Sequence, residues 1–134
     1  MNFRTFKQNK LVRDKIVEIM ESHGSKLYSY ALNDQDFQKQ LKLKLVEEAL
    51  EVQKTTNEQD LLEELADVLE IVHALSQLHN ISAPQLEAAQ IKKREEKGGY
   101  SKRLFLTFAE HPKDSPQERY CLADSQKYPE VKNQ

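Results

Sequence analysis

The acidic residues between positions 47 and 70 have the spacing most able to support chemistry in this 134-residue chain. Glu48 and Glu51 stand three residues apart, as do Glu64 and Asp67. Because helical residues three apart share a face, each pair would present two carboxylates together. Carboxylate oxygens are typical ligands of hard divalent cations. The spacing therefore predicts a cation site, for Mg²⁺ first and for Mn²⁺ as a substitute.

The face on which these four carboxylates lie distinguishes them from ordinary surface acids. At about 100° per residue, Glu48 falls in the middle of an apolar helical stripe and Glu51 on its edge. Burying unpaired carboxylates costs several kcal/mol, so the group needs protonation, basic partners or a bound cation. Glu64 and Asp67 share a face with five apolar residues, namely Leu61, Val68, Ile71, Leu75 and Leu78.

Basic residues are concentrated on both sides of the acidic segment. Residues 47–70 have a net charge of −8, whereas residues 1–44 and residues 92–103 each have +4. A Mg²⁺ ion held by carboxylates usually meets its substrate through phosphate oxygens, whose charge basic groups can neutralise. The candidate substrate contacts are Lys10, Arg13, Lys15, Lys93, Lys97 and Arg103.

Four helices must position these residues. Apolar spacing and end signals predict them at about 11–23, from 33 or 34 to 55, 58–79 and 82–97. Gly24 and the Gly98-Gly99 pair are typical helix stops. The third helix is apolar almost all round, which is typical of a buried helix.

The connections between these helices are short, which predicts an all-α fold, an antiparallel four-helix bundle. The second and third helices should pack as a hairpin, because the acidic segment spans their turn. Residues 104–108 read as a short strand. We expect a helical domain over residues 1–108 and a polar tail over residues 109–134, flexible or ordered only on a partner.

Composition excludes several functional classes. Charged residues make up 31% of the chain and the mean hydropathy is −0.78, so no apolar run is long enough for a membrane span. The first ten residues are polar and basic, unlike a signal peptide, and Cys121 is the only cysteine. The net charge of −2 argues against nucleic acid as a partner. We expect a cytoplasmic protein.

The acidic motif resembles that of a known family. Glu47-Glu48-x-x-Glu51 followed by Glu64-x-x-Asp67 is similar to the EExxE…ExxD pattern of the all-α nucleotide pyrophosphohydrolases, the MazG-like superfamily. Residues 10–16, Lys-Leu-Val-Arg-Asp-Lys-Ile, resemble the opening motif of its subgroup related to phosphoribosyl-ATP pyrophosphohydrolases. Residues 64–70 resemble that subgroup's third helix. Lys-Gly-Gly-Tyr at 97–100 resembles its Arg-Gly-Gly-Phe segment, with two departures.

The resemblance covers about residues 10–108 and implies an activity. It implies hydrolysis between the α- and β-phosphates of a nucleoside triphosphate or related nucleotide, giving a monophosphate and pyrophosphate. By this resemblance, Mg²⁺ is held by Glu48, Glu51, Glu64 and Asp67. Glu47 supports the site or orients the attacking water, so that Glu47 and Glu48 are the expected catalytic residues. It also implies a homodimer or homotetramer.

Three functional hypotheses follow. The first is a Mg²⁺-dependent nucleotide pyrophosphohydrolase, with a role in clearing non-standard nucleotides. The second is the phosphoribosyl-ATP pyrophosphohydrolase of histidine biosynthesis. The third is non-catalytic, a helical oligomerisation module that binds nucleotide or metal without turnover. The sequence leaves the preferred base open.

Overall fold

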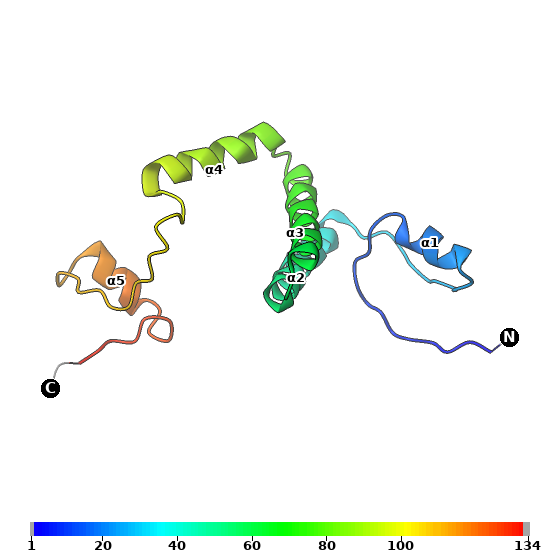
Figure 1. Ribbon diagram of the computed structural model, residues 1–134, viewed down its shortest axis with the longest axis horizontal. Helices are drawn as coiled ribbons and strands as arrows, with labels where there is room; N and C mark the ends of the chain where they lie inside the picture. Colours follow the sequence, from blue (N-terminus) through cyan, green and yellow to red (C-terminus); the bar gives the residue numbers. More distant parts are fainter. Residues whose placement is uncertain (1, 133–134) are drawn as a thin grey trace. The chain divides into compact units, whose positions relative to one another are not determined.

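The computed structural model describes residues 2–132, and all its regular structure is helical (Figure 1). The chain divides into two compact units, the first ending at Glu96 and the second beginning at Lys97. No helix in the described part is long and apolar enough to cross a membrane. The helices are α1 (Ile16–Ser22), α2 (Asp34–Lys54), α3 (Glu58–Leu78), α4 (Ala83–Lys97) and α5 (Pro116–Leu122).

Helices α2 and α3 form the expected hairpin (Figure 1). Each begins at an asparagine whose side chain accepts a backbone hydrogen bond. Asn33 accepts from the N–H of Asp36 at 2.8 Å, and Asn57 accepts from the N–H of Asp60 at 2.9 Å. Such N-caps satisfy donors that would otherwise lack partners in the first turn. Only residues 55–57 separate the two helices, so the chain reverses and the helices pack together.

Helix α4 begins with the capping box that its sequence predicts. The backbone N–H of Gln85 donates to Ser82 Oγ at 3.2 Å, and the N–H of Ser82 donates to Gln85 Oε1 at 2.8 Å. This reciprocal pair satisfies two backbone donors at the start of the helix. The expected bounds of 82–97 therefore agree with α4 to within one residue.

The first helix is shorter than its periodicity predicts. Helix α1 begins at Ile16, whereas the sequence indicates a start near Leu11. Residues 14 and 15 form a turn, and the segment before them is not helical. Arg13 at its end pairs with Asp67 of α3. A contact with a distant part of the chain thus accompanies the loss of the first predicted turn.

The finer parts of the expected architecture are not confirmed. Among the described residues of the first unit, α2 and α3 are the helices that pack on one another, so a four-helix bundle is not formed within it. Residues 104–108 have no regular secondary structure and pair with no described segment, so the expected strand is not formed there. Residues 109–134, expected as a polar tail, include α5, whose N-cap Ser115 accepts from the N–H of Glu118 at 3.1 Å. Asn133 and Gln134 lie outside the described residues.

The core of the hairpin is small. Leu41 of α2 and Ile71 of α3 are 3% and 8% exposed, and they are the buried hydrophobic residues in the described part of the chain. Helix α3 is therefore less buried than its nearly continuous apolar character predicts. About half or more of the side-chain surface is exposed at six apolar positions of the two helices, namely Leu43, Val46, Leu50, Leu62, Leu65 and Leu69.

Candidate metal centre

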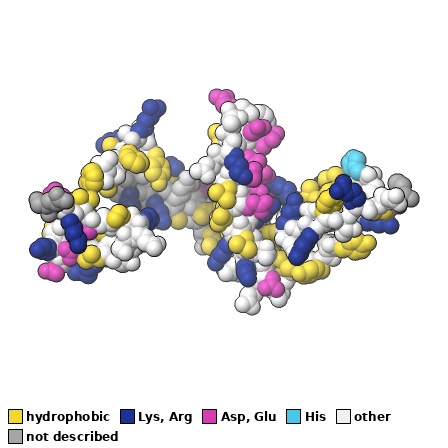
Figure 2. Space-filling model, turned by 90° about the horizontal axis from the view of Figure 1, so that it is seen from below, with side chains coloured by type: hydrophobic (Ala, Val, Ile, Leu, Met, Phe, Trp, Pro, Cys, Tyr) yellow, Lys and Arg dark blue, Asp and Glu magenta, His cyan; other side chains and the backbone are white. Residues whose placement is uncertain are grey.

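The hairpin brings one acidic residue of each pair, Glu48 and Glu64, to the same distance from the turn between the helices. Glu48 lies six residues before Lys54 at the end of α2, and Glu64 lies six residues after Glu58 at the start of α3. At 1.5 Å per residue, each is about 9 Å from the turn. Two antiparallel helices therefore place these side chains opposite one another. Figure 2 shows acidic side chains gathered on this pair of helices, with hydrophobic side chains beside them.

Three of the four predicted ligands converge. Carboxylate oxygens of Glu48, Glu64 and Asp67 all lie within 4.8 Å of one another, and all three residues are half-buried. Glu64 Oε2 is buried and has no hydrogen-bond partner among the described residues. A buried acceptor without a partner is costly. The group could therefore bind a cation through carboxylate oxygens alone. One of these oxygens, Glu64 Oε2, has no other partner.

The proximity of these carboxylates alters the protonation of Glu64. The side-chain hydrogen bond that Glu64 can make with Glu48 once it is protonated raises the pKa of Glu64 above its ordinary value of 4.5. Burial and the negative charges of Glu48, Asp67 and Glu51 raise this pKa further. The neighbouring carboxylates thus favour the protonated form of Glu64 more than water does. A divalent cation placed among the oxygens would displace that proton.

The fourth predicted ligand, Glu51, lies outside the group of three. Its Oε1 is 3.7 Å from Lys54 Nζ, one turn further along α2. Its charge nevertheless contributes to the raised pKa of Glu64, so it acts on the same site. Glu47, the predicted catalytic neighbour, is exposed, with its Oε1 3.4 Å from Lys44 Nζ. This agrees with its predicted place off the apolar face.

Two basic side chains contact the acidic group. Arg13 reaches Asp67 from the segment before α1, with its Nη2 2.6 Å from Oδ1. Lys44 lies one turn before Glu48 on α2, with its Nζ 3.6 Å from Glu48 Oε1. Arg13 is one of the phosphate contacts predicted from the sequence, whereas Lys44 is not among them. The spacing of four residues between Lys44 and Glu48 is the signal that could have indicated it.

The remaining candidate substrate contacts are not gathered at this site by the structure. Lys10, Lys15 and Lys93 are exposed residues of the first unit. Lys97 and Arg103 belong to the second unit, where the N–H of Arg103 closes a turn by donating to the carbonyl of Tyr100 at 3.0 Å. Their roles toward a substrate stay predictions.

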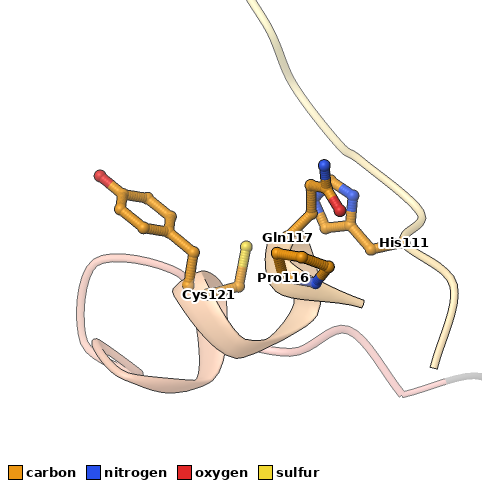
Figure 3. Close-up of a pocket in the computed structure, with 5 residues that line it drawn as sticks. His111, Pro116, Gln117 and Cys121 are labelled. Carbon is orange, nitrogen blue, oxygen red and sulfur yellow. The ribbon is translucent and has the colours of Figure 1, made fainter. Parts of the chain in front are cut away.

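Each unit also has a cavity lined by other residues. In the first unit a cavity of about 260 Å³ is lined by Lys42, Val72, Leu75, Ser76, His79 and Ile81. In the second unit a cavity of about 310 Å³ lies between α5 and the segment containing His111 (Figure 3). It is lined by His111, Pro116, Gln117, Tyr120 and Cys121. Neither cavity includes a carboxylate, so the acidic group on the hairpin remains the best candidate for chemistry.

The geometry of the group fits a hard divalent cation. The donors are carboxylate oxygens from two helices, and one buried oxygen lacks a partner. Mg²⁺ is usually held by one or two carboxylates together with waters and phosphate oxygens, which leaves room for a substrate. A comparison of the chain with protein-family models, curated proteins and solved structures found no match.

Proposed function

We propose that this chain is a Mg²⁺-dependent nucleotide pyrophosphohydrolase that cleaves between the α- and β-phosphates of a nucleoside triphosphate or related nucleotide. The observation that carries the proposal is the unpartnered, buried Glu64 Oε2 inside a group of three carboxylates. The EExxE…ExxD resemblance supplies the reaction class. A role in clearing non-standard nucleotides is part of the proposal.

Several carboxylates would coordinate the Mg²⁺ ion together. Glu48, Glu64 and Asp67 already converge, and Glu51, whose charge also acts on Glu64, would leave Lys54 to join them. When bound, Mg²⁺ would polarise the phosphoryl oxygens and lower the pKa of a coordinated water. Mn²⁺ would substitute because it accepts the same oxygen donors.

Glu47 would act on the attacking water. Its carboxylate is exposed, and it adjoins Glu48 without belonging to the converging group. It can therefore orient the water and accept its proton while the water oxygen forms its bond to phosphorus. The bond between the bridging oxygen and that phosphorus breaks, and the products are a nucleoside monophosphate and pyrophosphate. Lys44 beside Glu47 would stabilise the carboxylate before this transfer.

Arg13 would stabilise the charge on the phosphate oxygens. In the structure its guanidinium neutralises Asp67. When Asp67 serves as a ligand, Arg13 would leave this carboxylate and contact a phosphate of the substrate. Guanidinium groups suit this role because they donate to two phosphate oxygens at once.

A second copy of the chain would complete the fold around the site. The six exposed apolar residues of α2 and α3 leave the hairpin with more apolar surface than its own core covers. Association as a homodimer or homotetramer would bury that surface, and pairing two hairpins would form the expected antiparallel four-helix bundle.

A pyrophosphate-release screen over nucleotides tests the proposal. The screen should include standard and modified nucleoside triphosphates and phosphoribosyl-ATP, with and without Mg²⁺. We expect Mg²⁺-dependent release that Glu64→Gln reduces at least 100-fold, whereas Glu70→Gln, on the exposed face of the same helix, retains activity. Preference for phosphoribosyl-ATP would support the histidine-pathway alternative. Binding of Mg²⁺ or nucleotide without release would support the non-catalytic module.

A further inference from the structure

Lys44 of α2 contacts two consecutive carboxylates with one ammonium group. Its Nζ is 3.4 Å from Glu47 Oε1 and 3.6 Å from Glu48 Oε1. The side chains of Lys44 and Glu48 are 23% and 12% exposed. By comparison, the partners of the Lys54–Glu51 pair are 72% and 46% exposed. Because charges shielded from water interact more strongly than charges at the surface, Lys44 is the more effective positive charge beside the acidic group.

Lys44 and Arg13 lie at the same end of this group, although they come from separate segments. Lys44 lies ten residues before the end of α2, and Asp67, the partner of Arg13, lies nine residues after the start of α3. At 1.5 Å per residue, both helix positions are about 14–15 Å from the turn, whereas Glu48 and Glu64 are about 9 Å from it. The two positive charges therefore lie on the side of the acidic group that is further from the turn.

We propose, on the basis of the proposed function, that Lys44 is a further substrate-binding residue whose ammonium contacts a phosphate of the nucleotide. A phosphate oxygen that shares an ion with Glu48 lies within about 4 Å of that carboxylate, because each Mg–oxygen distance is about 2.0–2.1 Å. Since Lys44 Nζ is 3.6 Å from Glu48 Oε1, such an oxygen is within reach of the flexible lysine side chain. The ammonium has three N–H donors, so it can keep its contact with Glu47 while it donates to phosphate.

The charge of the site favours an anion beside Lys44. In the structure Lys44 neutralises Glu48, as Arg13 neutralises Asp67. When these two carboxylates serve as metal ligands, both positive charges are available to a ligand of opposite charge. Lysine is a common phosphate ligand in proteins, where it acts as a point charge. A triphosphate has several charged groups in a row and can therefore contact Lys44 and Arg13 together.

Binding of inorganic tripolyphosphate to the full chain in the presence of Mg²⁺ tests this assignment without requiring turnover. Isothermal titration compares wild type with Lys44→Gln, Lys44→Arg and Lys42→Gln. Lys42 is an exposed lysine of the same helix, about 200° around the axis from Lys44, so Lys42→Gln is the matched control for loss of one positive charge. Circular dichroism of each variant checks that the helices are retained.

We expect Lys44→Gln to bind tripolyphosphate about tenfold more weakly than wild type or worse, because a charge-assisted hydrogen bond is lost. Lys42→Gln should bind it as wild type does, and Lys44→Arg should recover most of the affinity, since guanidinium also donates to phosphate. Mg²⁺ alone should bind Lys44→Gln at least as tightly as wild type, because a positive charge beside Glu48 is removed. A lysine that only held Glu48 in place would instead weaken Mg²⁺ binding when replaced.

A double variant separates direct contact from action through Glu47. If Lys44 contacts phosphate itself, Lys44→Gln should weaken tripolyphosphate binding equally in wild type and in a Glu47→Gln background. Loss of the effect in that background, equal binding by Lys44→Gln and wild type, or no tripolyphosphate binding by wild type would overturn the assignment. The proposed function fails separately, if wild type binds Mg²⁺ and tripolyphosphate but releases no pyrophosphate from any nucleotide.

Discussion

The guanidinium of Arg13 lies 2.6 Å from the carboxylate of Asp67, although 54 residues separate them in the sequence. The contact joins the segment before α1 to the middle of α3. It brings a residue of the predicted phosphate-binding set to a residue of the predicted metal-binding set. The predicted metal-binding and phosphate-binding residues are therefore joined by a direct ion pair.

Replacing Arg13 should affect metal binding and turnover in opposite directions. Arg13→Gln removes the cation that competes with Mg²⁺ at Asp67, so Mg²⁺ should bind several-fold more tightly. Turnover should fall by about 10²–10³-fold, because one donor to the developing phosphate charge is lost. Since the ion pair is exposed, stability should change by less than about 1 kcal/mol.

Isothermal titration with Mg²⁺ and pyrophosphate release measure the two effects of Arg13→Gln. Lys39→Gln, at an exposed position of α2, is the matched control for loss of one positive charge. Weaker Mg²⁺ binding by Arg13→Gln, or full activity, would contradict the assigned role.

Magnesium should stabilise the wild-type protein against heat. Binding to the folded state alone contributes about 2.7 kcal/mol when the free ion is at 100 times its Kd, which corresponds to a rise in Tm of several degrees. Glu64→Gln should abolish this rise, because the buried oxygen no longer belongs to a carboxylate. Glu70→Gln should retain it. Differential scanning calorimetry with Mg²⁺ or with a chelator gives the comparison, and equal shifts in both variants would exclude Glu64 as a ligand.

The metal-free protein should lose stability as the pH rises through the raised pKa of Glu64. Because the folded state raises this pKa above 4.5, it binds the proton more tightly than the unfolded state does. The resulting stabilisation is fully present below the unfolded pKa and is lost once Glu64 ionises in the folded protein. Glu64→Gln should remove this component. Urea unfolding in chelator from pH 4 to pH 8 should therefore show wild type weakening relative to Glu64→Gln as pH increases, and parallel pH profiles would contradict the shift.

The exposed leucines of the hairpin should mediate self-association. Leu69 of α3 is 56% exposed, so Leu69→Glu places a charge where a second copy would bury an apolar side chain. We expect wild type to sediment as a dimer or tetramer and this variant as a smaller species. Glu63→Lys also changes the charge of α3, but at an exposed polar position, and should leave the assembly intact. Wild type that sediments as a monomer at all concentrations would refute the expected assembly.

Much of the hairpin could be predicted from local sequence signals. The caps Asn33 and Asn57 mark where α2 and α3 begin, and apolar spacing defines their lengths. The same periodicity placed Glu48, Glu64 and Asp67 on inward faces, and the structure brings these three together. These features were predictable because caps, helical spacing and a short turn act over only a few residues.

The sequence alone thus determined the two helices of the hairpin and the faces on which their carboxylates lie, whereas only the tertiary structure decided which charges meet. Periodicity extended the first helix back to Leu11, but the chain there forms the segment that carries Arg13 to Asp67. The strand expected at 104–108 lacks a pairing partner in the described chain, and the leucines of α3 lack a covering surface. The physical reason is the separation along the chain over which each interaction acts. Helix signals are local, while ion pairs between distant segments, strand pairing and burial depend on surfaces that local sequence does not specify.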